Sequence, residues 1–171
     1  YWNDPDATNK TIIDGWVHTG DIGEFDDENY LKITDRKKDI IVNAGGDNIS
    51  PSRIEAKLDI EPEIAQSMLY GDFKNYLVAV IVPDKDFAIN WAKENTKDEN
   101  FGAIVKDENF NKVMKEVVNK VNKNLSVIEQ VRKFILIDHE FTIENSMMTP
   151  SMKVRRFAVK DKYGDQLEEL Y

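Results

Sequence analysis

The sequence predicts an α+β fold in which a small sheet is covered by helices and is preceded by a short strip rich in β-strands. Two neighbouring runs of β-forming residues, at 64–70 and 76–82, indicate the sheet. Between Phe110 and Leu125, apolar residues recur at the spacing of an amphipathic helix. Before residue 35 there are only short β-runs separated by turn-like residues, and these indicate the strip.

The strip at residues 1–35 has short predicted strands at 16–17, 22–25 and 30–33, and the turn-like residues 26–29 join the last two as a hairpin. This stretch is too short to enclose an apolar core of its own. We therefore expect it to pack on another part of the protein or on the residues that follow it.

Residues 36–171 are predicted to form the covered sheet. Ser50 and Pro51 combine a hydroxyl N-cap with proline at the first helical position, which predicts a helix to about Leu58. The other expected elements are, in order, a β-run at 40–42 with a turn at 44–48 and a return at Ile49, the strands at 64–70 and 76–82, a helix from Asp84 to about Asn95, the helix capped by Asp107, a strand at 134–137, and a polar tail.

The composition excludes several classes of protein. The chain has 171 residues, with 23 Lys+Arg against 32 Asp+Glu and a formal net charge of −9. This excess of negative charge argues against nucleic-acid binding, because that affinity depends on neutralising phosphates. The absence of cysteine excludes disulfides, thiolate metal sites and a cysteine nucleophile. No apolar run approaches the ~20 residues of a membrane span, and the start at Tyr1 leaves native targeting unread.

Two clusters in the first third of the chain suit nucleotide chemistry. Asp21 follows Gly20 in a turn, where its carboxylate could accept hydrogen bonds from both ribose hydroxyls, although such turns are more often plain loops. Arg36 lies among basic residues beside a β-run and could contact phosphate or ribose oxygens. The paired glycines Gly45 and Gly46 allow close approach of the backbone to a ligand. On spacing alone, the second cluster is more commonly interpreted as a solvated charged loop followed by a hairpin turn.

A third cluster lies near the end of the chain, where Lys153 follows a Thr-Pro-Ser sequence at 149–151. A lysine in such a loop can place its own mobile ammonium group in a neighbouring site. The alternative interpretation is a basic surface tail, because Lys153, Arg155 and Arg156 form the one evident basic patch. A weak contact with a polyanion is conceivable there.

Together, the three clusters resemble the ordered motifs of the adenylate-forming superfamily, which includes acyl-CoA synthetases, firefly luciferase and nonribosomal-peptide adenylation domains. Residues 14–21 resemble the D-G-W-x-x-T-G-D motif, and residues 35–39 resemble the hinge motif. The resemblance covers nearly the whole chain. It implies that Asp21 and Arg36 contact the ribose of ATP and AMP, and that the small domain rotates about Lys38.

The resemblance also implies roles for residues of the small domain. Gly45 and Gly46 match the loop beside the CoA channel, and Lys153 matches the catalytic lysine that bridges the carboxylate and the α-phosphate during adenylation. Many members carry Gly directly before that lysine, where this chain has Met152. The surrounding sequence resembles the long-chain fatty-acyl branch, in which a bulky apolar residue is usual at this position.

The resemblance thus implies the carboxy-terminal part of an AMP-forming long-chain fatty-acid–CoA ligase. Residues 1–35 would end the adenylation domain, and residues 36–171 would form the mobile lid with its hinge near 36–39. The implied substrates are a fatty acid, ATP with Mg²⁺, and CoA, and the implied partner is the enzyme's own amino-terminal domain. No metal site, nucleic-acid partner or transmembrane segment is expected. The expected localisation is cytoplasmic, with peripheral membrane association left open.

Other functions stay open on the sequence alone. The family's phosphate loop lies outside these residues, so we expect the chain by itself to be inactive. An adenylation domain for another acid or for a carrier protein would keep the fold and change the substrate or the acceptor. A non-catalytic interaction module is a further alternative, in which the amphipathic helix docks a partner, although such an apolar stripe is more often core.

Overall fold

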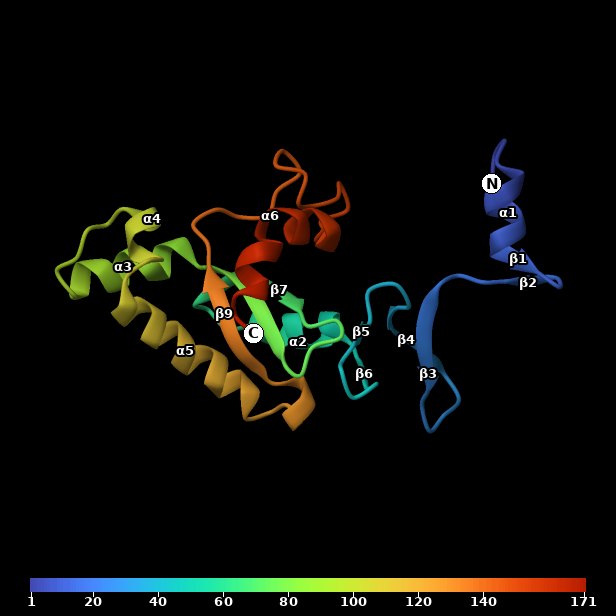
Figure 1. The fold of residues 1–171 in the computed structure, drawn as a ribbon, viewed down its shortest axis with the longest axis horizontal. Helices are drawn as coiled ribbons and strands as arrows, with labels where there is room; N and C mark the ends of the chain where they lie inside the picture. Colours follow the sequence, from blue (N-terminus) through green and yellow to red (C-terminus); the bar gives the residue numbers. More distant parts are fainter. The chain divides into compact units, whose positions relative to one another are not determined.

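A computed structural model describes residues 1–171, which divide into two compact units, Tyr1–Ile40 and Ile41–Tyr171 (Figure 1). The sequence-based boundary between residues 35 and 36, with a hinge near 36–39, stays a prediction. None of the helices combines the length and apolar composition needed to cross a membrane.

Unit 1 consists of one short helix followed by two small hairpins. Its elements are α1 (Pro5–Thr11), β1 (Ile12–Ile13), β2 (Trp16–Val17), β3 (Asp21–Phe25) and β4 (Leu31–Arg36). Asp4 caps α1 by accepting a hydrogen bond from the Ala7 N–H at 2.8 Å. The Asp26 carboxylate closes the β3–β4 turn by accepting bonds from the N–H groups of Glu28 and Tyr30, at 3.0 and 2.9 Å. The predicted hairpin is therefore confirmed.

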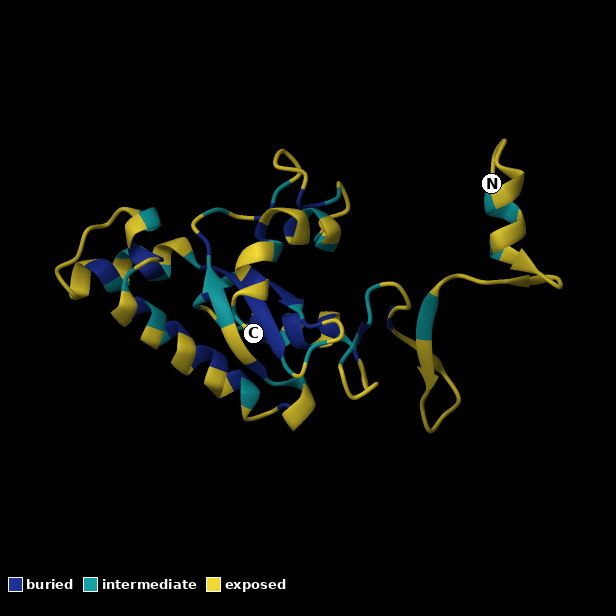
Figure 2. Ribbon diagram, viewed as in Figure 1, coloured by how far each residue is buried: buried dark blue, intermediate teal, exposed yellow.

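Unit 1 has no apolar core of its own, as its length predicts. None of its apolar side chains is fully buried, and most of the strip is exposed (Figure 2). Trp2 is 94% exposed and Trp16 is 76% exposed. Cross-strand hydrogen bonds and turn contacts, rather than burial, hold these hairpins together.

Unit 2 is built around a three-stranded sheet. Its strands lie in the order β7 (Ile64–Tyr70), β8 (Leu77–Pro83) and β9 (Val131–Leu136). β7 runs antiparallel to β8, and β9 runs parallel to it. Every residue of β8 is apolar and buried. Because successive side chains of a strand point to opposite faces, β8 requires a cover on both faces of the sheet.

Helices supply those two covers. One face carries α2 (Pro51–Leu58), α3 (Lys85–Glu94) and α5 (Glu108–Asn122), whose apolar side chains share a core with Leu77, Ala79 and Ile81. The other face carries α6 (Arg156–Glu168), which packs with Val78, Val80 and Val82 (Figure 2). The alternation of the β8 side chains thus divides the interior into two cores.

The predicted helix starts have the expected local chemistry. Pro51 opens α2 at the first helical position. Asp84 accepts a bond from the Phe87 N–H at 2.8 Å, and Asp107 accepts one from the Asn109 N–H at 2.8 Å. The predicted β-run and its return are present as β5 (Ile41–Val42) and β6 (Asn48–Ile49).

The predicted polar tail is wrong, because the end of the chain forms α6. Its buried residues, Val159, Tyr163 and Leu167, lie four residues apart with charged residues between them. One apolar residue per turn makes a stripe too narrow to stand out in the sequence. The prediction also omitted two short helices, α1 and α4 (Phe101–Ile104), and began β9 three residues late.

Replacement of Leu167 by Ala tests the role of α6. Leu167 is fully buried against the β8 face, so we expect Leu167→Ala to lower the free energy of unfolding by about 2–4 kcal/mol. Phe157 lies in the first turn of the same helix but is 81% exposed, and Phe157→Ala should change it by less than about 0.5 kcal/mol. Urea denaturation measures both. Equal effects of the two substitutions would show that α6 does not cover the sheet.

Candidate functional site

Asp21 and Arg36 lie directly opposite each other in the β3–β4 hairpin. The Nε atom of Arg36 is 2.8 Å from Oδ1 of Asp21, and its Nη1 donates to the Thr19 carbonyl at 3.4 Å. The Lys37 N–H bonds the Gly20 carbonyl at 2.8 Å, which fixes the turn before Asp21. The structure thus brings together the two residues predicted to contact ribose, with one carboxylate oxygen engaged by the guanidinium group.

The predicted hinge residue Lys38 lies in a turn that follows β4. The Arg36 carbonyl accepts bonds from the N–H groups of Asp39 at 2.9 Å and Ile40 at 3.2 Å. Lys38 itself is exposed. The Asp35 side chain is buried and accepts a bond from the Arg36 N–H at 2.8 Å. The turn therefore has a fixed backbone immediately around an exposed lysine.

Gly45 and Gly46 form the tip of the β5–β6 hairpin. Asn43 organises the tip, because its Oδ1 accepts from the N–H groups of Gly45 and Asp47, both at 2.9 Å. Gly46 has a φ of +85°, in the left-handed region that favours glycine, and open space surrounds the position of a Cβ atom there. An added side chain would meet strain rather than a clash.

The β5–β6 hairpin is fastened to the turn between β7 and β8. Phe73 N–H donates to the Val42 carbonyl at 2.8 Å, and Ala44 N–H donates to the Lys74 carbonyl at 3.0 Å. The Asp72 carboxylate accepts from the Val42 N–H at 3.1 Å. These bonds fix the glycine tip relative to the sheet of unit 2.

Lys153 lies on a tight turn between β9 and α6. The Thr149 N–H donates to the Lys153 carbonyl at 2.8 Å, and the Lys153 N–H donates to the Thr149 hydroxyl at 3.0 Å. Met148 and Val154 pair as an isolated β-bridge at the base of the turn. The Lys153 side chain is exposed, and its ammonium group has no hydrogen-bond or ion-pair partner. A fixed backbone thus presents a free cation.

The backbone conformation of Met152 shows why glycine suits the position before this lysine. Its φ is +59°, in the left-handed region that side chains with a Cβ atom rarely adopt. The conformation is set by the turn, in which the Met152 N–H donates to the Thr149 carbonyl at 2.9 Å. Met152 is 71% exposed, so no packing compensates for this backbone strain.

Residues 38–171 match the family model described as the AMP-binding enzyme C-terminal domain. The chain belongs to this family. The match includes Lys38, Gly45, Gly46 and Lys153, whereas Asp21 and Arg36 lie before it.

Relatives of this AMP-binding C-terminal domain include long-chain ligases. The chain is 35% identical over 173 residues to long-chain-fatty-acid–CoA ligase FadD15 of Mycobacterium tuberculosis, covering 100% of this chain and 29% of that protein. It is 33% identical over 175 residues to long-chain-fatty-acid–CoA ligase 1 of Homo sapiens, covering 100% of this chain and 25% of that protein. The matched segment is the carboxy-terminal part of these relatives.

Solved structures of adenylate-forming enzymes share the fold. The adenylation domain of a carboxylate reductase from Mycobacterium chelonae matches with a TM-score of 0.86 and 27% identity, covering 100% of this chain and 25% of that one. ATP-bound MatB from Rhodopseudomonas palustris matches with a TM-score of 0.65 and 25% identity, covering 98% and 28%. These matches confirm the predicted fold class, a small sheet covered by helices.

The predicted basic patch of this AMP-binding C-terminal domain is only partly present. Lys153 and Arg155 are exposed, but the Arg156 guanidinium group is turned to the Glu55 carboxylate and bonds it through both terminal nitrogens. The sequence separation of 101 residues between Glu55 and Arg156 hid this pair from local pattern analysis. No three His, Asp or Glu side chains of the chain are placed to hold a metal ion together.

His139 is held in a polar cluster beside α6. Its Nδ1 lies 2.8 Å from Oδ1 of Asp138, and its Nε2 contacts the hydroxyl of Tyr163. The hydrogen bond with His139 lowers the pKa of Asp138. Burial, together with the negative charge of Asp138, raises the pKa of Tyr163 to about 12, so its hydroxyl remains a donor. His139 therefore fastens the chain before the Lys153 turn to α6, as a structural residue.

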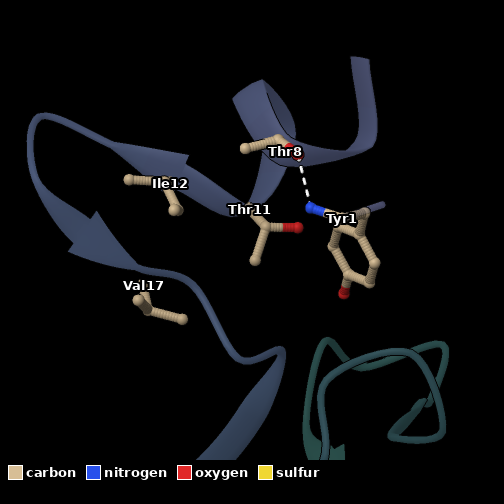
Figure 3. A pocket seen from close by; sticks show the side chains of 5 residues that line it. All are labelled: Tyr1, Thr8, Thr11, Ile12 and Val17. Atoms are coloured by element: carbon tan, nitrogen blue, oxygen red, sulfur yellow. Dashed lines mark hydrogen bonds between the residues drawn. The ribbon is translucent and has the colours of Figure 1, made fainter. Parts of the chain in front are cut away.

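A cavity of about 210 Å³ lies within unit 1 (Figure 3). It is lined by Tyr1, Thr8, Thr11, Ile12 and Val17, and its wall is mostly apolar. The amino-terminal ammonium group of Tyr1 bonds the Thr8 hydroxyl at 2.6 Å at its edge. None of the predicted site residues lines this cavity, so it adds nothing to the candidate site.

Substitutions of Met152 test the strained turn. We expect Met152→Val to lower the free energy of unfolding by about 1 kcal/mol, because a β-branched residue is disfavoured in the left-handed region. Met152→Gly should change it by less than about 0.5 kcal/mol, since relief of strain is offset by the larger entropy of the unfolded chain. Urea denaturation, with amide exchange at Lys153 as a local measure, compares them. A glycine variant as unstable as the valine variant would contradict this account.

Proposed function

We propose that this chain is the carboxy-terminal part of an ATP-dependent ligase that joins a long-chain fatty acid to CoA through an acyl-AMP intermediate. The observation that carries the proposal is Lys153, whose free ammonium group projects from a turn with a fixed backbone. The long-chain substrate is supported by the names of the relatives at 33–35% identity. The chain spans about a quarter to 29% of their length, so the activity belongs to the larger protein.

Lys153 would serve the adenylation half-reaction. A carboxylate oxygen attacks the α-phosphorus of ATP, and the bond from that phosphorus to the leaving pyrophosphate breaks. Negative charge accumulates on the α-phosphate oxygens during this step, and a preorganised ammonium group stabilises it. Mg²⁺ would enter with the ATP and offset the negative charge of its phosphates.

The Asp21–Arg36 pair would hold the nucleotide. One Asp21 oxygen is engaged by Arg36, and the second oxygen is available to accept a hydrogen bond from a ribose hydroxyl. The Arg36 side chain is half exposed and has further N–H groups to donate. The pair therefore presents both an acceptor and donors, which matches the hydroxyl and ether oxygens of a ribose.

The second half-reaction would use the other loop of unit 2. The sulfur of CoA attacks the acyl carbonyl carbon, and AMP leaves as the thioester forms. Open space around the Gly46 tip would allow the pantetheine chain to pass close to the backbone. We propose that rotation about Lys38 exchanges the Lys153 turn for the glycine tip between the two steps.

Replacement of Lys153 in the full-length ligase is the decisive test. We expect Lys153→Ala to reduce fatty-acid-dependent pyrophosphate release by ~10²–10³-fold, because it removes the charge that stabilises the transition state. Thioester formation from preformed acyl-AMP should be spared. Both rates are measured with a long-chain fatty acid, ATP, Mg²⁺ and CoA.

Lys115 provides a matched control, because it is an exposed lysine on α5 for which Ala suits the helix equally well. Lys115→Ala should leave both half-reactions unchanged. An unchanged adenylation rate in Lys153→Ala would refute the assigned role. A wild-type enzyme that forms no adenylate with any acid would refute the ligase and favour an interaction module.

A hinge at Lys38 predicts a different pattern. Proline restricts φ at that position, so we expect Lys38→Pro to slow thioester formation and to spare adenylation. The Lys38 N–H makes no backbone hydrogen bond in the turn, so the substitution removes none. The same two assays measure the effect in the full-length enzyme. Equal slowing of both half-reactions would rule out a hinge at this residue.

A carrier-protein acceptor is the second candidate function. Its motivation is a structural neighbour, the A-PCP didomain of a carboxylic acid reductase from Segniliparus rugosus in complex with AMP, which matches with a TM-score of 0.79 and 26% identity, covering 100% of this chain and 23% of that one. A wild-type enzyme that forms acyl-AMP but ignores CoA would favour this acceptor. Since the phosphate loop of the family is not among residues 1–171, we expect no turnover from this chain alone.

A further inference from the structure

One ion pair in unit 2 connects distant parts of the chain. The Arg156 guanidinium group bonds both oxygens of Glu55, with Nη1 at 2.7 Å from Oε1 and Nη2 in contact with Oε2. The side chains are 23% and 11% exposed, respectively. Glu55 lies on α2, and Arg156 begins α6, three residues after Lys153. Such a bidentate, largely buried pair has a well-defined geometry.

The pair is also anchored to the free edge of the sheet. β7 is an edge strand, and the N–H and carbonyl of Leu69 point away from β8. Oε1 of Glu55 accepts from the Leu69 N–H at 2.6 Å, and Nη1 of Arg156 lies 3.5 Å from the Leu69 carbonyl oxygen. The ion pair thus takes the place of a neighbouring strand at this point of the edge.

A second anchor lies on the same strand, at the other end of the segment that carries Lys153. The Gln66 side chain accepts from the Phe141 N–H at 2.6 Å and donates to the Phe141 carbonyl at 3.1 Å. Phe141 itself is 1% exposed. The segment from Phe141 to Arg156 is therefore held to β7 at both ends, by side chains of Gln66 and Glu55.

We propose that Glu55 and Arg156 are positioning residues for Lys153 in adenylation, an inference that rests on the proposed function. Between the two anchors, the chain contains no helix or strand, only turns and the Met148–Val154 bridge. Without the ion pair, the exit of the Lys153 turn loses its polar link to the edge strand β7 and keeps the apolar packing of Met147, Met148 and Val159 on the sheet. A displacement of about 1 Å in a catalytic group can cost ~10²-fold in rate.

The competing explanation is that the pair only braces the fold. The two explanations are separated by measuring the two half-reactions individually. Loosening of the Lys153 turn should slow adenylation but leave the rate of thioester formation unchanged, because that step uses another loop. The variants are Arg156→Met and the double variant Glu55→Gln/Arg156→Met in the full-length enzyme. Arg156→Met leaves a largely buried carboxylate without its partner and destabilises the fold. The double variant removes both charges, while the amide oxygen of the introduced glutamine can still accept from the Leu69 N–H.

We expect pyrophosphate release to fall about 10- to 100-fold in both variants, with thioester formation from preformed acyl-AMP retained. Urea denaturation should show stability lost in Arg156→Met and largely recovered in the double variant. Amide exchange at Thr149, Lys153 and Arg155 should be faster than wild type in both variants. If the double variant recovers adenylation together with stability, the proposal is overturned, because that result would show that the ion pair only stabilises the fold.

Arg53→Met is the matched control. Arg53 lies on the same helix as Glu55 but forms its ion pair with Glu129, away from the Lys153 turn. It should leave adenylation and the exchange of the three amides unchanged, and an equal loss of adenylation would also overturn the proposal. A wild-type enzyme that forms no adenylate refutes the proposed function instead. The exchange rates then decide by themselves whether the ion pair fixes the turn.

Discussion

The burial of β8 on both faces determines the arrangement of unit 2. Seven consecutive apolar residues leave this strand no face that can meet water, so the sheet needs helices on each side. The β5–β6 hairpin and α2, which precede the sheet, and the helices α3 and α5, which lie between β8 and β9 in the sequence, together cover one face of the sheet. Only the end of the chain is left to complete the other, which is why α6 folds back over Val78, Val80 and Val82. The Lys153 turn is the connection that this return requires.

Both loops proposed to act in catalysis combine a fixed backbone with a free surface. Asn43 and the β7–β8 turn hold the glycine tip, and the Thr149 hydroxyl and a β-bridge hold the Lys153 turn. The Lys153 ammonium group has no hydrogen-bond or ion-pair partner, and no other atom of the chain fills the space beside Gly46. A domain that presents different groups in two successive steps needs this division, because order in the backbone places each group without blocking it.

The sequence predicted elements whose signals are local and missed those that depend on distant contacts. The cap residues Asp84 and Asp107, the apolar spacing of α5 and the turn of the β3–β4 hairpin lie within short windows, and each prediction was confirmed. The helix α6 has one buried residue per turn, and its stability comes from a sheet formed far earlier in the chain. The Glu55–Arg156 pair also depends on a contact between distant parts of the chain, and no residue near Arg156 in the sequence indicates its partner. The Asp21–Arg36 pair was predicted as two residues with one ligand, and their hydrogen-bonded contact came only from the strand register.

The parallel pairing of β9 with β8 has a consequence for the order of folding. β7 and β8 are joined by a short turn, so their hairpin closes at little entropic cost. The strand β9 can join only after residues 84–130 have been brought into a compact crossover, and non-local pairing of this kind is slow. Until then the hairpin exposes two apolar faces and an unprotected edge, which are the features that favour association between chains. During synthesis, a chain in which β7 and β8 have emerged before β9 and α6 therefore exposes these surfaces to other chains.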